Sequence, residues 1–128
     1  MLLNMRGGML PLEIKSMTDE QFDALQEPLP DNVFQVMSYQ KLGRVAGMDM
    51  MDRCALIYCT KKFKWGSPYK EYHVSEASHP HIHQAIEHAW EQVVLARSEE
   101  IPARLSCCST PEAAKRVQCP LIASCFQL

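Results

Sequence analysis

Histidines are concentrated in one short stretch of the chain, and their side chains could bind a transition metal. All five lie between residues 73 and 88, and three of them, His81, His83 and His88, fall in a predicted helix. Neutral imidazoles are good zinc ligands, but this spacing matches no closed set of four ligands. We interpret these histidines as surface and helix-start residues. A zinc site and a pH-sensing cluster are the alternatives.

Lysines and aromatic residues interleave in the segment Lys61–Tyr72. Lysines attract phosphates and aromatic rings stack on unpaired bases, so this segment could bind single-stranded nucleic acid. Alternation with period two also fits a half-buried hairpin whose aromatic side chains point inward. Because Trp and Tyr anchor many interfaces, a protein-binding surface is a third interpretation. The candidate partner-binding residues are Lys62, Lys64, Trp65 and Tyr69.

Cysteines crowd the end of the chain, where four of the six occur. No pair in this tail has the short spacing of a structural zinc site. A catalytic thiolate needs a nearby base and an oxyanion site, and no local pattern marks either. We therefore interpret the cysteines as reduced, packed thiols of a cytoplasmic protein. The tail cysteines are Cys107, Cys108, Cys119 and Cys125.

Overall composition narrows the class of protein. The chain has 128 residues, 47% of them hydrophobic and 22% charged, with a formal net charge of -2. Such a chain is ordinary for one globular domain and is not a generally basic nucleic-acid binder. No apolar run approaches the roughly 20 residues that span a bilayer, so we expect no membrane partner.

Local signals predict the elements that must position these residues. Thr18 and Gln21 fit a capping box, which predicts a short helix ending near Glu27. Pro80 predicts the start of a long helix that fades near Arg97. The apolar stripe of this long helix is Ile82, Ile86 and Val93, and a last short helix follows Thr110. Strands are predicted over residues 33–40, 53–63 and 69–74, and a short strand or packed tail over 121–126.

Together these elements predict a single α+β domain over residues 1–128. Its expected core is a three-stranded antiparallel sheet with one long packed helix and short N- and C-terminal helices. Residues 1–16 are expected to be a flexible lead-in, and residues 99–128 a short helix and a cysteine-rich tail.

The function that these patterns favour is a small non-enzymatic protein-interaction module, such as an inhibitor or accessory factor. We expect a protein partner and no cofactor, and the sequence leaves the oligomeric state open. One alternative is a small zinc-binding domain that uses His81, His83 and His88. The other is a single-stranded nucleic-acid binder that uses the Lys61–Tyr72 hairpin.

Overall fold

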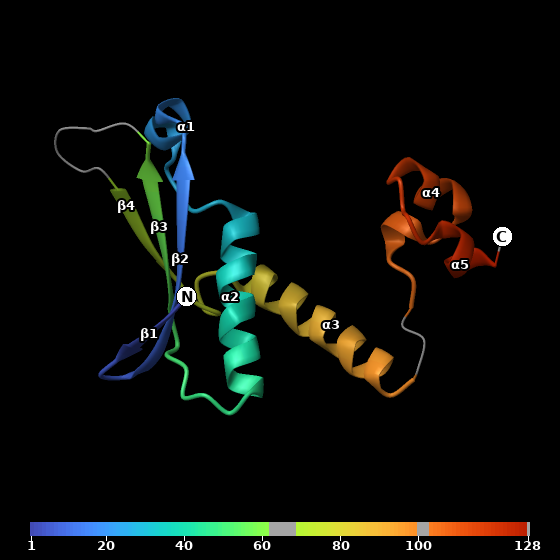
Figure 1. Cartoon of the computed structure of the whole chain (residues 1–128), viewed down its shortest axis with the longest axis horizontal. Coiled ribbons are helices and arrows are strands. Elements are labelled where there is room, and N and C mark those ends of the chain that lie inside the picture. Colours follow the sequence, from blue (N-terminus) through green and yellow to red (C-terminus); the bar gives the residue numbers. More distant parts are fainter. Residues whose placement is uncertain (62–68, 100–102, 128) are drawn as a thin grey trace. The chain divides into compact units, whose positions relative to one another are not determined.

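A mixed four-stranded sheet, with its helices on one face, forms the larger part of the fold (Figure 1). The computed structural model describes residues 1–61, 69–99 and 103–127. The chain divides into two compact units, Met1–Ala89 and Trp90–Leu128. The fold class is α+β, as the sequence predicts.

The N-terminal segment forms a β-hairpin at one edge of the sheet. Strands β1 (Leu2–Met5) and β2 (Gly8–Met17) pair in antiparallel fashion, with Met5 opposite Gly8. The prediction that residues 1–16 form a flexible lead-in is therefore wrong. The two glycines that interrupt the apolar run form the tight turn between the strands. Gly8 has a φ of 118°, a backbone conformation that glycine adopts with little strain.

Helix α1 (Asp19–Ala24) begins where its capping residues predict. The Gln21 backbone amide donates to the Thr18 side chain at 3.3 Å, and the Thr18 amide donates to the Gln21 side chain at 3.2 Å. Both bonds satisfy amides that the first turn would otherwise leave without a partner. The helix ends at Ala24, before the predicted end at Glu27.

Helix α2 (Pro30–Val45) replaces the strand predicted over residues 33–40. The β-branched and aromatic content of this segment favours a strand, but its buried side chains recur three and four residues apart, as on one face of a helix. Pro30 at the first position and Asp31 in the first turn also suit a helix start. The buried residues of α2 are Val33, Val36, Met37, Gln40 and Gly43.

Strand β3 (Cys54–Thr60) is central, as predicted, with β2 on one side and β4 (Tyr69–Val74) on the other. Strands β3 and β4 are antiparallel, as predicted, whereas β2 and β3 are parallel. Parallel neighbours need a long crossover, which α1 and α2 provide. The predicted three-stranded antiparallel sheet is thus corrected to a mixed sheet in the order β1-β2-β3-β4.

The main core lies between the sheet and the helices. Tyr58 is fully buried there, and its hydroxyl accepts a hydrogen bond from the Leu29 amide at 3.0 Å and donates one to Asn32 Oδ1 at 2.9 Å. The pKa of the Tyr58 hydroxyl is raised, mainly because the hydroxyl is buried. The other core residues are Met17, Phe22, Leu25, Val33, Val36, Met37, Cys54, Leu56, Val74 and Ile86.

Helix α3 (Pro80–Arg97) begins and ends as predicted. In its first half, Ile86 is buried and Ile82 packs against the main core. Val93 is 42% exposed. The prediction that the whole Ile82, Ile86 and Val93 stripe packs on the sheet is therefore wrong for Val93.

Short helices make up the described C-terminal part of the second unit: η1 (Ser106–Cys108), α4 (Pro111–Arg116) and α5 (Ile122–Phe126). The Thr110 hydroxyl caps α4, as predicted, by accepting a hydrogen bond from the Ala113 amide at 3.2 Å. Helix α5 replaces the strand or packed tail predicted over residues 121–126. Among the described helices, none is long and apolar enough to cross a membrane.

Candidate functional site

The face of the sheet opposite the helices is the candidate functional site. Side chains alternate between the two faces of a strand. In β3, Leu56 and Tyr58 enter the core shared with the helices, so Ile57 and Cys59 point to the other face. A second apolar cluster covers part of this face, and no described helix contributes to it; its members are Leu10, Leu12, Met51, Ala55 and Ile57. We call this surface the helix-free face.

Strand register gathers apolar side chains from three strands on the helix-free face. Ile14 of β2 lies opposite Ile57 of β3, and Cys59 of β3 lies opposite Tyr69 of β4. Ile57 and Cys59 are two residues apart on one strand, so they join the two pairs. Directly opposed side chains have Cβ atoms about 5 Å apart and pack against each other. We call these four residues the sheet patch.

The outer members of the sheet patch are half exposed. Ile14 is 49% exposed and Tyr69 is 51% exposed, while Ile57 and Cys59 are partly buried between them. A single exposed apolar side chain is ordinary on a protein surface. A contiguous group of them on one face of a sheet is suited to binding another apolar surface.

Polar side chains lie beside the sheet patch on the same face. Glu71 is opposite Ile57, and His73 is opposite Ala55. Their side chains contact each other, with 2.7 Å between His73 Nε2 and Glu71 Oε1. An apolar centre with a polar rim is the usual anatomy of a protein interface.

The structure places the predicted partner-binding residues only in part. Tyr69 belongs to the sheet patch, whereas Lys62, Lys64 and Trp65 lie outside the described residues. Lys70, also in the predicted nucleic-acid hairpin, turns toward α1 and donates to the carbonyl oxygens of Phe22 at 2.6 Å and Leu25 at 2.8 Å. That lysine is therefore engaged within the fold.

Sequence reasoning missed Ile14, because this residue lies in the segment predicted as a lead-in. The signal that could have found it is the alternation of Leu10, Leu12 and Ile14 at period two. Its neighbour Ile57 comes from a distant segment, and a sequence pattern alone does not supply that pairing.

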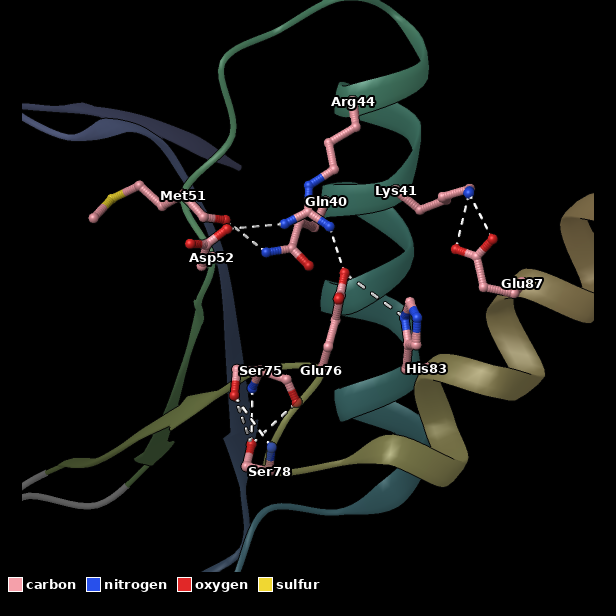
Figure 2. A network of polar contacts seen from close by, with 10 residues as sticks. All are labelled: Gln40, Lys41, Arg44, Met51, Asp52, Ser75, Glu76, Ser78, His83 and Glu87. Atoms are coloured by element: carbon pink, nitrogen blue, oxygen red, sulfur yellow. Dashed lines mark hydrogen bonds and ion pairs between the residues drawn. The ribbon is translucent and has the colours of Figure 1, made fainter.

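The predicted metal-binding histidines are spread along α3. His81 and His88 are exposed, and seven residues of helix place their Cα atoms about 10 Å apart. His83 is partly buried, with Nδ1 3.7 Å from Glu76 Oε1 (Figure 2). Within residues 1–61, 69–99 and 103–127, no group of three or more histidine, cysteine or acidic side chains could hold a metal ion. The described residues thus lend the zinc alternative no support.

A polar network centred on Glu76 connects α2 with the turn between β4 and α3 (Figure 2). Glu76 accepts a hydrogen bond from Arg44, whose Nη2 also lies 3.4 Å from Asp52 Oδ1. An acid flanked by a guanidinium and the His83 imidazole resembles a catalytic arrangement, so a nearby nucleophile would matter. Cys54 interacts electrostatically with Arg44 and Glu76, but it is fully buried, and this burial raises its pKa to about 12. Its thiol therefore stays protonated and unreactive near neutral pH.

The remaining contacts of this network hold elements together. Both carboxylate oxygens of Glu87 on α3 accept hydrogen bonds from Lys41 on α2, each at 2.8 Å. The buried Gln40 side chain donates to the Met51 carbonyl at 2.6 Å and so fixes the segment that leads into β3. We interpret the network as a structural joint between α2, the segment before β3 and the start of α3.

The six cysteines are all free thiols. In the second unit, Cys107 and Cys125 are exposed, and Cys108 and Cys119 are partly buried. The prediction that the tail thiols are packed is therefore wrong for Cys107 and Cys125. Their exposure makes them accessible to thiol reagents.

A cavity of about 500 Å³ opens where the end of β2 meets α1 and the start of α2. Lys15 is the cation at its wall, and its Nζ is 2.9 Å from both Glu13 Oε1 and Gln35 Oε1. The hydrogen bond to Glu13 is the main cause that raises the pKa of Lys15. Because this ammonium is already neutralised, the cavity presents no unpaired charge to an anionic ligand. Its other polar wall residues are Ser16, Gln21 and Asn32.

Comparison of the chain with models of known protein families, with curated proteins and with solved structures finds no match in any of the three. Proposals about function therefore rest on the residues and their geometry.

Proposed function

We propose that this chain is a small non-enzymatic protein-interaction module that binds a protein partner through the sheet patch. The observation that carries the proposal is the continuous apolar path from Ile14 through Ile57 and Cys59 to Tyr69 on the helix-free face. Burying such a surface against a partner removes apolar area from water, which is the main favourable term in protein association.

Tyr69 is the expected anchor of the interface. Tyrosine is enriched among residues whose truncation weakens interfaces most, because its ring buries a large area and its hydroxyl can still find a partner. It stands at the edge of the patch and is 51% exposed, so a partner can reach it without rearranging β4. Six free thiols fit a reducing compartment, and we place the interaction in the cytoplasm.

Capture of the partner from a native extract tests the proposal. The immobilised full chain is compared with Ile14→Ala and Tyr69→Ala in reducing buffer. Truncating an anchor costs about 2 kcal/mol or more, so Tyr69→Ala should weaken partner binding by about thirtyfold. Val45→Ala on α2 is the matched control, because Val45 is 50% exposed but lies on a helix.

The proposal predicts a partner that wild type and Val45→Ala retain and that the two patch variants lose. A partner that all four chains hold equally well contradicts the assignment of the surface. Binding that disappears in chelator would favour the zinc alternative. Capture of RNA that falls steeply with salt would favour the nucleic-acid alternative.

A further inference from the structure

The outer edge of β4 is an open sheet edge within the described part of the chain. Strand β4 pairs with β3 on one side, and no described backbone group hydrogen-bonds to its other side. An edge of this kind can pair with another strand, and proteins usually guard against that with charged side chains, prolines or bulges. The strand Tyr69–Val74 contains no proline and has an unbroken register with β3.

The charged side chains of β4 have partners within the chain, so they oppose pairing at this edge less than unpaired charges would. Lys70 is turned inward, where its Nζ contacts carbonyl oxygens next to α1. Glu71 and His73 contact each other at 2.7 Å, so an acceptor and an imidazole stand side by side on the helix-free face. Their side chains are 46% and 41% exposed, respectively. The edge therefore presents a complementary pair and not a run of like charges.

Symmetry limits how two copies of β4 could pair. Residues that face each other in an antiparallel pair share one face of the sheet, so the register of a two-fold dimer can shift only in steps of two residues. Three of these registers place Glu71 or His73 opposite one of the same two residues in the other copy. One places Glu71 opposite Glu71 of the other copy, and another places His73 opposite His73. The third places each Glu71 opposite the His73 of the other copy.

We propose that a second copy of this chain pairs with the outer edge of β4 in antiparallel fashion, with Tyr72 on the two-fold axis and Glu71 opposite His73. In this register each carboxylate faces an imidazole of the other copy, and the four side chains alternate as acceptor and donor. The two sheets become continuous, and the interface is isologous, as in most homodimers. The inference goes beyond the proposed function, because the dimer uses the edge of the sheet and leaves the sheet patch open.

Sedimentation equilibrium of the full chain in reducing buffer tests the proposal. In this register Lys70 lies opposite Val74 of the other copy, so the ladder spans residues 70–74 of each β4. This is a small interface, and we expect a monomer–dimer equilibrium in the micromolar to millimolar range. Glu71→Lys places a lysine opposite His73 and should raise the dissociation constant about tenfold or more. The exchange Glu71→His with His73→Glu restores the complementary pairs and should return the constant to its wild-type range.

Matched controls keep the result interpretable. Leu3→Lys introduces a lysine at β1, the other edge of the sheet, and should leave the dimer intact. Glu71→Gln keeps the size of the side chain and should weaken the dimer severalfold. This variant serves as the test if Glu71→Lys does not fold. Amide hydrogen exchange should slow over residues 69–74 as the concentration rises.

A chain that stays monomeric through the millimolar range overturns the proposal. A dimer that Leu3→Lys dissociates and Glu71→Lys does not would belong to β1 and would overturn it as well. The test does not depend on the sheet patch, because Ile14→Ala should dimerise like wild type whether or not the sheet patch binds a partner.

Discussion

The hydroxyl of Tyr58 on β3 accepts a hydrogen bond from the backbone amide of Leu29 at 3.0 Å, directly before α2 begins. The same hydroxyl donates to Asn32 Oδ1, so one atom connects the centre of the sheet to the first turn of the helix. Tyr58→Phe should lower the free energy of unfolding by about 1–3 kcal/mol, because two polar groups lose their partner. Urea denaturation measures the change. Tyr69→Phe is the control and should leave stability unaltered, since Tyr69 is 51% exposed.

Gly8 and Gly47 provide a paired test of the hairpin turn. Both have positive φ, 118° and 81°, so alanine is strained at either position. A Cβ at Gly8 would also lie 2.7 Å from the Asp49 carbonyl oxygen, whereas at Gly47 it would meet nothing within 4 Å. Gly8→Ala should therefore destabilise the protein more than Gly47→Ala, by about 1 kcal/mol or more. Equal thermal midpoints for the two variants would contradict the close approach of Gly8 to Asp49.

Burial of Cys54 predicts a loss of stability in alkali. The folded thiol has a pKa raised from 9.0 to about 12, so between these values the unfolded chain releases a proton that the folded chain retains. The contribution of Cys54 to the free energy of unfolding is complete below pH 9 and is lost as pH rises toward 12. Burial also raises the pKa of the Tyr58 hydroxyl, so the comparison is made with Cys54→Ala. The free energy of unfolding should decline less steeply with pH in the variant than in wild type. Parallel curves of stability against pH would show that Cys54 contributes nothing to the decline.

Thiol labelling should separate the cysteines by exposure. Cys107 and Cys125 are exposed, whereas Cys54 is fully buried and has a raised pKa. A maleimide at neutral pH should modify the exposed pair first and Cys54 only after unfolding. Peptide mass spectrometry over time gives the order. Early labelling of Cys54 in the folded protein would contradict its position in the core.

The ion pair between Lys41 and Glu87 should couple α2 weakly to α3. Its atoms are 2.8 Å apart, but the two side chains remain 23% and 39% exposed. A double-mutant cycle of Lys41→Met and Glu87→Gln should give a coupling of about 0.5 kcal/mol. The coupling should fall as salt is added. A value that does not respond to salt would point to packing of the side chains instead of charge.

Elements with a local chemical signal could be predicted from the sequence. Thr18, Pro80 and Thr110 mark helix starts through hydrogen bonds or backbone restraints within a single turn, and all three predictions are confirmed. Residues 33–40 show the opposite case. Their β-branched composition favours a strand, and the helical spacing of Val33, Val36 and Met37 decides the structure only when a sheet is there to bury them.

The sheet patch could not be predicted because it depends on pairing between distant segments. Ile14 and Ile57 are adjacent only through the parallel register of β2 and β3. Tyr69 could be predicted from the sequence, since an aromatic residue in a predicted strand is a common interface anchor. The exposure of Ile14 instead follows from α1, α2 and the start of α3 packing on the other face of the sheet, and no local pattern encodes that.

The parallel connection between β2 and β3 also sets an order of events during folding. Each hairpin closes by local contacts, whereas pairing Ile14 with Ile57 must first close a loop of about 40 residues. We therefore expect the two hairpins to form early, as separate halves of the sheet. The two halves then join in a later step, when α2 docks. A nascent chain that stops after α2 holds one hairpin with a bare inner edge. Such a truncated product should aggregate instead of forming a smaller stable fold.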